Sequence, residues 1–207
     1  MSAANLGKAF WRDYFGEEYW RNYGGIGEDY TENLMQNMPT FPEIAKVVPE
    51  GKAALEGKSI LCLGSAFGHE LLHLQEHGMR PHGVEISPYC LEKLLPSAQD
   101  LCTPGDALEF LQAQPAGSYD YVLASCLEYM PDEESLTQAL QHCQRVARRG
   151  LLLICVQADM DEDVENHVVS VLKDHSWWKD AVAAAGFGEL SKDEFIQWAP
   201  KTDTAAA

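Results

Sequence analysis

Acidic and small residues recur at the ends of four apolar segments of this 207-residue chain. The segment ends are Gly64-Ser65-Ala66-Phe67-Gly68, then Glu85-Ile86, then Asp106-Ala107, and last Ser125, which is followed by Glu128-Tyr129. Small residues let a backbone approach a ligand closely, and a helix that starts after such a turn offers unpaired N–H groups. Glu85 follows Gly64 by 21 residues, the spacing at which nucleoside-binding folds place a ribose-binding carboxylate. The pattern predicts a site for a nucleotide-like ligand.

Alternating strands and helices must position these residues. We expect strands at 59–64, 81–86, 98–102, 118–125 and 150–156 and a final pair near 187–190 and 194–198. The expected helices are 68–78, 88–95, 106–113, 132–147, near 163–173 and 176–185. This order predicts an α/β fold, a doubly wound and mostly parallel seven-stranded sheet with helices on both faces and ligands at the carboxyl ends of its strands.

The aromatic-richest stretch precedes the sheet, between Asn5 and Tyr30. Phe10 and Tyr14, like Trp11 and Phe15, are four residues apart and form one stripe if the segment is helical. The stripe either packs as a helical cap on the domain or closes its rings over a cationic ligand. Gly24-Gly25-Ile26-Gly27 could be a hinge, and 33–38 reads as a short helix. We expect a cap and connector at 1–58, a binding domain at 59–200 and a tail at 201–207.

The strand-end residues resemble those of the class I S-adenosylmethionine-dependent methyltransferase family, and the resemblance covers roughly residues 59–187. It implies that Gly64, Ser65, Ala66 and Gly68 line the methionine end of S-adenosylmethionine. It further implies that Glu85 holds the ribose hydroxyls and that Ile86 packs on the adenine. Asp106 would accept from the adenine amino group, with the Ala107 backbone beside it, and Ser125 would lie under the sulfonium. The segment around Glu18 to Tyr23 resembles an aromatic entry segment, so that Tyr14 and Tyr19 would close over the cofactor.

Two departures from the family pattern concern the methionine end. Cys62 stands where the family usually has an acid, and Ala66 replaces a glycine. The structural alternatives are a helix N-cap for Asp106, a solvated strand-end charge for Glu85 and a turn former for Ser125. If the acceptor is a hydroxyl or ammonium, a side chain must take its proton, and Glu128 and Tyr129 are the candidates.

His69-Glu70-Leu71-Leu72-His73 also matches a zinc-binding helix pattern, with two imidazoles on one face and a glutamate between them. The position of His69 directly after a ligand-binding turn favours the cofactor interpretation, and no metal is expected.

The net charge of −17, with 32 acidic and 15 basic residues, argues against a nucleic-acid partner or an anionic membrane. Six cysteines without a CxxC pair are expected to be reduced thiols. No apolar stretch is long enough for a membrane helix or a signal core, so a soluble cytoplasmic protein is expected.

The sequence therefore predicts an S-adenosylmethionine-dependent methyltransferase that acts on a small molecule. The alternatives are a cyclase or lyase that consumes the cofactor and releases methylthioadenosine, a protein side-chain methyltransferase, and a non-enzymatic adaptor. The acceptor and the oligomeric state stay open.

Overall fold

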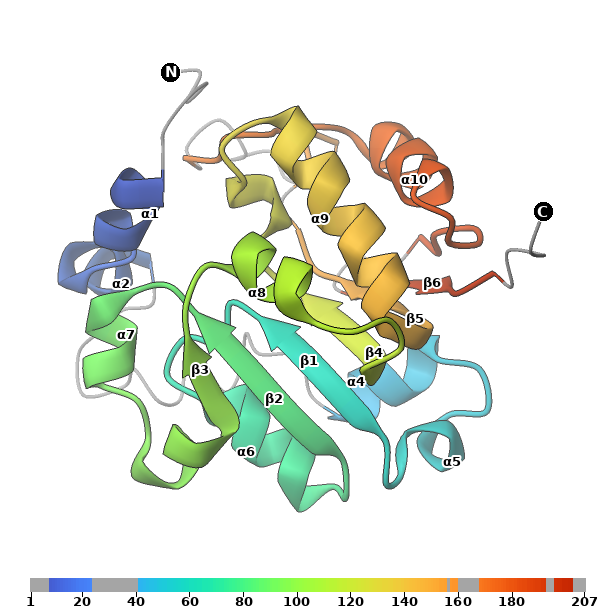
Figure 1. Cartoon of the computed structure of the whole chain (residues 1–207), viewed down its shortest axis with the longest axis horizontal. Helices are drawn as coiled ribbons and strands as arrows, with labels where there is room; N and C mark the ends of the chain where they lie inside the picture. The colour runs from blue at the N-terminus through green and yellow to red at the C-terminus, as the bar shows by residue number, and fades with distance from the viewer. Residues whose placement is uncertain (1–7, 24–40, 156, 160–167, 193–195, 203–207) are drawn as a thin grey trace.

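The computed structural model describes residues 8–23, 41–155, 157–159, 168–192 and 196–202 (Figure 1). A single sheet runs through them, in the order β3-β2-β1-β4-β5-β6. Its strands are β1 (Ser59–Leu63), β2 (Arg80–Glu85), β3 (Cys102–Pro104), β4 (Tyr119–Ala124), β5 (Ala147–Leu153) and β6 (Gln197–Pro200). The pairings among β1 to β5 are parallel, and β6 runs antiparallel to β5. The strand order reverses between β1 and β4, which is where doubly wound sheets bind ligands.

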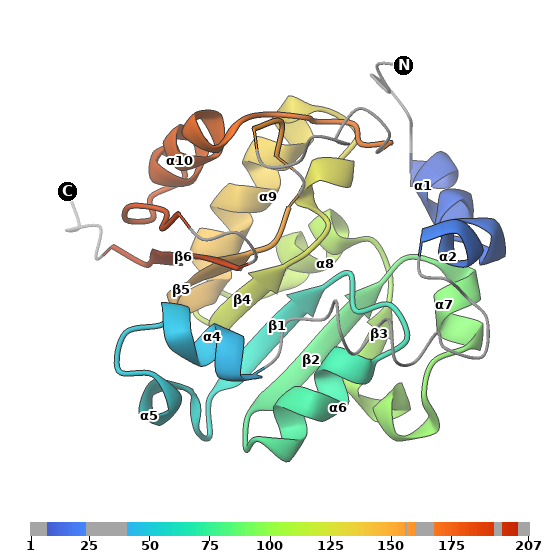
Figure 2. The same cartoon turned by 180° about the vertical axis from the view of Figure 1, so that it is seen from behind.

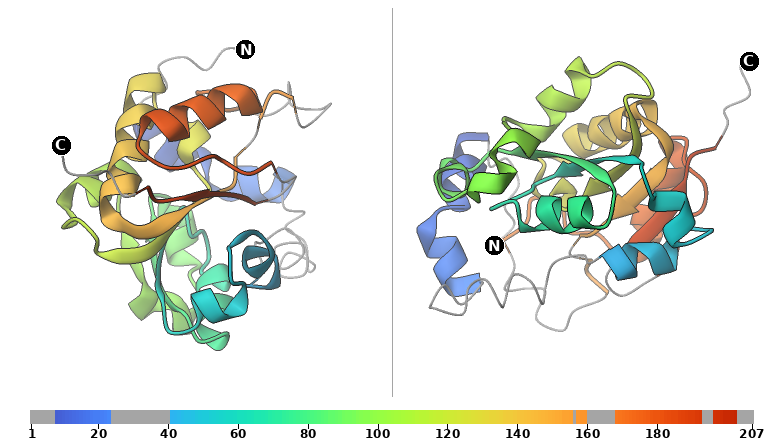
Figure 3. Two further views of the ribbon diagram at one scale, coloured as in Figure 1. Left: turned by 90° about the vertical axis from the view of Figure 1, so that its right-hand side faces the viewer. Right: turned by 90° about the horizontal axis from the view of Figure 1, so that it is seen from below.

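The sheet is buried on both faces because alternate residues of its apolar strands enter two separate cores. In β1, Leu61 and Leu63 belong to one core and Ile60 and Cys62 to the other. The first core packs against α8 (Ala107–Ala113), α9 (Glu133–Val146) and α10 (His175–Ala184). The second packs against α4 (Phe41–Val47), α5 (Lys52–Leu55) and α6 (His69–Glu76). Figure 2 shows α4 and α6 in front of the sheet, and the orange α10 and blue α4 lie on opposite sides of it in Figure 3.

Three of the helices begin at an aspartate that caps them. Asp106, Asp132 and Asp174 each accept a hydrogen bond from the backbone N–H three residues further on, at 2.7–2.9 Å. Such caps satisfy a backbone donor that the helix itself leaves unpaired. The three caps therefore fix the residue at which α8, α9 and α10 each begin.

The aromatic segment forms two short helices, α1 (Lys8–Tyr14) and α2 (Glu17–Tyr23). They lie at the end of the sheet toward which the arrows of β1 and β2 point, next to α7 (Pro88–Glu92) in Figure 1. The predicted stripe is present, with stacked rings at 5.3 Å for Phe10 and Tyr14 and at 5.9 Å for Trp11 and Phe15. A hydrogen bond of 2.7 Å from the Ser87 hydroxyl to the Phe15 carbonyl oxygen ties this segment to the loop after β2.

The fold class is confirmed, but the prediction of seven strands is wrong: the described chain has six. Residues 187–190 form only one isolated bridge, between Phe187 and Lys201. Residues 96–101 form a 3₁₀ helix that starts at Pro96, so β3 begins only at Cys102. Residues 168–173 are not helical, and α4 and α5 were not expected. The expected hinge at 24–27 and helix at 33–38 lie outside the described residues, as do residues 163–167 of the helix expected near 163–173.

All six cysteines lie in the described part of the chain and are free thiols. Among the helices that the structure describes, none is both long and apolar enough to span a bilayer.

Candidate functional site

A cavity of about 170 Å³ opens at the carboxyl ends of β1, β2 and β4. Its walls combine strand-end residues with the aromatic helices α1 and α2. The lining residues are Trp11, Phe15, Tyr19, Trp20, Gly64, Ala66, Val84, Glu85, Ile86, Gly105, Asp106, Ala107, Ser125, Cys126, Tyr129, Met130 and Pro131. Most residues that the sequence analysis placed at a binding site therefore surround one space.

The turn after β1 depends on a left-handed backbone. Gly64 and Gly68 have φ angles of 82° and 84°, and Ala66, at 45°, is one of two non-glycine residues with a positive φ in the described chain. A Cβ atom on Gly64 would approach the Cβ of Cys126 to 3.1 Å, so glycine keeps the turn close to the strand-end loop. The Gly64 N–H donates to the Val84 carbonyl oxygen at 2.9 Å, which joins the turn to β2.

Glu85 lies at the end of β2 and is buried beside that turn. One carboxylate oxygen accepts a hydrogen bond from the Ala66 N–H at 2.8 Å, and the other accepts one from the Ser87 N–H at 2.7 Å. Desolvation raises the pKa of Glu85, and these backbone hydrogen bonds oppose the rise. A carboxylate can accept about four hydrogen bonds, so Glu85 retains capacity for a ligand in the cavity.

Asp106 lines the cavity and also caps α8, so the structural interpretation of this residue is correct and the binding interpretation stays a prediction. Ser125 has a structural partner too, since its hydroxyl donates to the Leu63 carbonyl oxygen at 3.0 Å. Both side chains are thereby oriented by the fold before any ligand binds.

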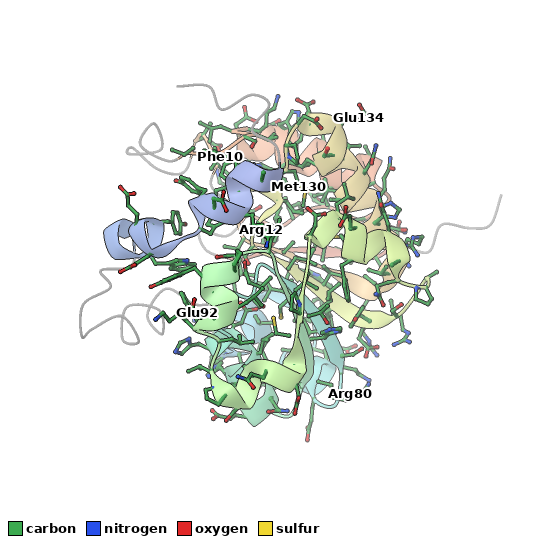
Figure 4. All side chains as sticks on the ribbon, turned by 60° about the vertical axis from the view of Figure 1, so that its left-hand side comes forward. Phe10, Arg12, Arg80, Glu92, Met130 and Glu134 are labelled. Atoms are coloured by element: carbon green, nitrogen blue, oxygen red, sulfur yellow. The ribbon has the colours of Figure 1, made fainter. Side chains whose placement is uncertain are left out.

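Five rings form the wall opposite the strand ends. Tyr129 follows β4, and the other four rings come from α1, from α2 and from the turn between them: Trp11, Phe15, Tyr19 and Trp20. Tyr129 packs edge-on against both Trp11, at 5.2 Å between ring centroids, and Phe15, at 5.0 Å. Figure 4 labels Met130, a neighbour of Tyr129 in this wall, close to α1, which carries Phe10 and Arg12. The N-terminal segment thus supplies four of these five rings.

The two proposed catalytic residues have different environments. Tyr129 lines the cavity and shares a side-chain hydrogen bond with Tyr19. Desolvation raises the pKa of both phenols, so both are protonated near neutral pH. Glu128 is buried and does not line the cavity, but its charge acts on Tyr129, Tyr19 and Cys126.

Tyr14, Ser65 and Gly68 were also predicted to bind the cofactor, and they do not line the cavity. Tyr14 stacks on Phe10, Ser65 contacts the Cys102 sulfur at 3.3 Å, and Gly68 starts α6. Cys126 and Met130 line the cavity although the sequence analysis did not assign them to it, and Trp20 was included only as part of the aromatic entry segment. Trp11 and Phe15 were predicted, from their four-residue spacing, to form a stripe that either packs as a cap or closes over a cationic ligand, and both line the cavity.

The segment from His69 to His73 lies in α6. Within the ranges that the structure describes, no three His, Cys, Asp or Glu side chains are placed to hold an ion. Glu70 is buried with its carboxyl group against the Cys62 thiol, and the His73 ring packs on His77 at 4.4 Å.

Comparisons with known proteins relate this chain to methyltransferase domains. Residues 61–155 match the model of the family described as methyltransferase domain. A curated relative, the S-adenosyl-L-methionine-dependent Diels-Alderase iccD of Talaromyces variabilis, is 31% identical over 116 residues. The match covers 53% of this chain and only 39% of the length of that relative.

Solved structures share the fold at low identity. Magnesium protoporphyrin IX methyltransferase from Synechocystis PCC 6803, solved with bound SAH, has a TM-score of 0.67 and 15% identity, and covers 95% of this chain and 100% of its own. The [4+2]-cyclase SpnF has a TM-score of 0.55 and 17% identity, and covers 73% of this chain and 59% of its own. The chain therefore carries a methyltransferase domain match at residues 61–155 and has the fold of the class I S-adenosylmethionine-dependent methyltransferases, as the sequence resemblance predicts.

Proposed function

We propose that this protein is an S-adenosylmethionine-dependent methyltransferase that acts on a small molecule. The observation that carries the proposal is the meeting of Glu85, Asp106 and the Gly64 turn around one cavity at the carboxyl edge of the sheet. A structure with the same fold, magnesium protoporphyrin IX methyltransferase, has been solved with bound SAM. The net charge of −17 supports a small-molecule acceptor over a nucleic acid.

The cavity residues fit the chemistry of this cofactor. Glu85 and Asp106 are acceptors for hydroxyl and amino groups, and Glu85 is already held in place by two backbone N–H groups. Gly105 has open space where a Cβ would lie, so the backbone between these two acids can approach a flat ring. The aromatic wall lies across the cavity from them, where a cation would be attracted to the ring faces.

S-adenosylmethionine supplies an electrophilic methyl group, and the task of the protein is to orient an acceptor and exclude water. The rings of Trp11, Phe15 and Tyr129 provide the dry wall. Because both tyrosines are protonated at neutral pH, we assign to Tyr129 a hydrogen-bonding role. Glu128 is the candidate base that takes a proton from the methyl acceptor. Because Glu128 does not line the cavity, the loop after β4 would have to rearrange to bring its carboxylate to the acceptor.

Calorimetry with S-adenosylmethionine tests the cofactor assignment. Glu85→Ala is expected to weaken binding at least roughly tenfold, because the variant lacks a charge-assisted contact to the ribose hydroxyls. Glu92→Ala, on the exposed side of α7, is the control and should bind as the wild type does. Equal affinity of the Glu85→Ala variant and the wild type would remove Glu85 from the site.

A second function is favoured by the comparisons. A relative named as a Diels-Alderase and a structural neighbour named as a [4+2]-cyclase both share this fold. We therefore propose cyclisation of a small molecule as the alternative activity.

Identifying the products distinguishes methyl transfer from cyclisation. S-adenosylhomocysteine would indicate methyl transfer and methylthioadenosine would indicate a cyclisation that consumes the cofactor. Unchanged S-adenosylmethionine together with an isomerised acceptor would indicate a cycloaddition. A methyl group gained by a polypeptide would move the assignment to protein side chains.

A further inference from the structure

Ser87 is a buried serine between the cavity carboxylate and the aromatic segment (residues 8–23). It lies in the loop after β2 and is 0% exposed. Its N–H donates to the Oε1 atom of Glu85 at 2.7 Å, and its hydroxyl donates to the Phe15 carbonyl oxygen at 2.7 Å. One residue therefore contacts both the acid that the proposed function assigns to the ribose and the segment that carries four of the five rings of the wall.

The Ser87 hydroxyl acts as an acceptor and as a donor. Its oxygen accepts a hydrogen bond from the Cys90 N–H at 3.2 Å, which caps α7. A serine hydroxyl has a single hydrogen, and the Phe15 carbonyl oxygen, which can only accept, is its partner here. Because the serine is fully buried, this hydrogen bond is made in a low-dielectric environment, where it is stronger than in water.

The Phe15 carbonyl oxygen lies in the turn between α1 and α2 and accepts from several donors. The Trp20 indole N–H donates to it at 3.2 Å from within the aromatic segment, and the Cys90 thiol, a weak donor, lies 3.9 Å away. Of these three donors, Ser87 makes the shortest contact, and it comes from the loop after β2. The Phe15 ring packs edge-on against Tyr129 at 5.0 Å, so the position of this turn also sets the position of the wall.

Hydrogen bonds run without a break from the turn after β1 to the aromatic wall. The Ala66 N–H donates to the Oε2 atom of Glu85 at 2.8 Å, Glu85 accepts from Ser87, and Ser87 donates to Phe15. A ligand in the cavity lies between Glu85 and the rings and contacts both ends of this path. If the Ser87 hydroxyl holds the wall closed, then its removal lowers the fraction of molecules that are competent to retain a ligand.

We propose that Ser87 is a positioning residue that holds the aromatic segment closed over the bound cofactor, through the hydrogen bond from its hydroxyl to the Phe15 carbonyl oxygen. The cofactor in this statement rests on the proposed function. Ser87 does not line the cavity, so its effect on the ligand is exerted through the Phe15 turn.

Hydrogen exchange of backbone amides tests the tie in the free protein. Ser87→Ala keeps the N–H that donates to Glu85 and removes the hydroxyl, so exchange should become roughly fivefold faster in residues 8–23 as well as in α7. Asp174→Ala removes the cap of α10, does not alter the cavity lining, and should leave exchange in residues 8–23 unchanged. Ser87→Thr retains a hydroxyl and should restore slow exchange in both segments. Urea denaturation would establish that each variant is folded.

Dissociation of S-adenosylhomocysteine tests the effect on the ligand. Stopped-flow tryptophan fluorescence would follow it, since Trp11 and Trp20 line the cavity. Ser87→Ala is expected to release S-adenosylhomocysteine roughly fivefold faster than the wild type, while the association rate changes by less than about twofold, because an open wall does not hinder entry. Saturating S-adenosylhomocysteine should slow exchange of residues 8–23 in the wild type and less so in Ser87→Ala.

Faster exchange confined to α7 in Ser87→Ala would reduce Ser87 to a helix cap. Equal acceleration of residues 8–23 in Asp174→Ala, or no recovery in Ser87→Thr, would also overturn the tie. Unchanged dissociation of S-adenosylhomocysteine from Ser87→Ala would show that the tie does not retain the ligand. A wild type that binds no S-adenosylhomocysteine would overturn the proposed function, and exchange of residues 8–23 in the free variants would still decide whether Ser87 holds the aromatic segment.

Discussion

Glu70 is a carboxyl group in an apolar core. It lies in α6 and is buried together with Cys62, Leu71 and Leu74. The Cys62 thiol is its hydrogen-bond donor, and its Oε1 atom has no partner in the described chain. Desolvation raises the pKa of Glu70 to about 7. Cys62, which stands where the resembled family usually carries an acid, is thus paired with an acid from the following helix.

The ionisation of Glu70 should make the protein less stable as pH rises. The folded-state pKa lies above the unfolded value, so the folded protein binds the extra proton and its stability is full below the unfolded pKa of about 4.5. The free energy of unfolding should fall between pH 4.5 and about 7, by on the order of 3 kcal/mol, and stay low above that. Urea denaturation at pH 5 and pH 8.5 measures this difference.

Glu70→Gln removes the titration while keeping the shape of the side chain, so its stability should change less between these two pH values. Glu76→Gln, on an exposed position of the same helix, is the control and should retain the wild-type pH dependence. Identical pH profiles of the wild type and Glu70→Gln would mean that Glu70 ionises without a penalty.

The sequence was sufficient to place a residue at the site where the residue directly follows a strand of the parallel sheet. Glu85 and Asp106 follow parallel strands, and parallel strands bring their carboxyl ends to one edge. Trp11 was not predictable as a cavity residue, because the side of a two-turn helix that faces a cavity depends on how the helix docks. Glu70 was ambiguous for a related reason, since a helical His-Glu-x-x-His spacing is the same for a metal site and for a core face.

At the scale of elements, the carboxyl-terminal region shows where prediction from apolar patterns failed. The Gly188 N–H donates to the Pro200 carbonyl oxygen at 2.7 Å and the Ser191 N–H to the Trp198 carbonyl oxygen at 2.8 Å. Pro200 has no backbone N–H, so it cannot donate a hydrogen bond back to residue 188. The paired hydrogen bonds of a regular antiparallel ladder are therefore interrupted between these two segments. The alternation of apolar residues does not reveal that a backbone donor is missing in the partner segment. The expected seventh strand is therefore only a single bridge.

The helix caps allow the structural and binding roles of Asp106 to be separated. Asp106 and Asp174 cap α8 and α10 with nearly equal geometry, at 2.9 and 2.8 Å, and only Asp106 lines the cavity. Asp106→Ala and Asp174→Ala should each lower the free energy of unfolding by about 1 kcal/mol through the lost cap. Only Asp106→Ala should also weaken S-adenosylhomocysteine binding, by roughly fivefold or more, because only this variant lacks an acceptor for the adenine amino group.

Calorimetry and urea denaturation on the same samples would check both effects. If the two variants bind S-adenosylhomocysteine equally well, then Asp106 is a cap and nothing else.

At the scale of the whole molecule, the cavity is lined by two parts of the chain, the strand ends of the sheet and the N-terminal aromatic segment. The sheet provides the polar side, and α1 and α2 provide the rings, with the Ser87 to Phe15 hydrogen bond between them. A ligand that contacts both sides should stabilise the folded chain by about 2.7 kcal/mol at a concentration one hundred times its dissociation constant. For a protein of 207 residues this corresponds to a rise in Tm of about 5–10 °C.

Tyr19 and Tyr14 allow the contribution of the cap to this stabilisation to be measured. Their rings contact each other at 5.1 Å, but Tyr19 lines the cavity and Tyr14 does not. Tyr19→Ala should lose about 3–5 °C of the Tm rise produced by a fixed concentration of S-adenosylhomocysteine, as expected for a roughly tenfold weaker complex. Tyr14→Ala should lose ring packing in the free protein and keep the full ligand-induced rise. Equal rises for both variants and the wild type would show that the ligand contacts the sheet alone, and the aromatic helices would then serve only as packing.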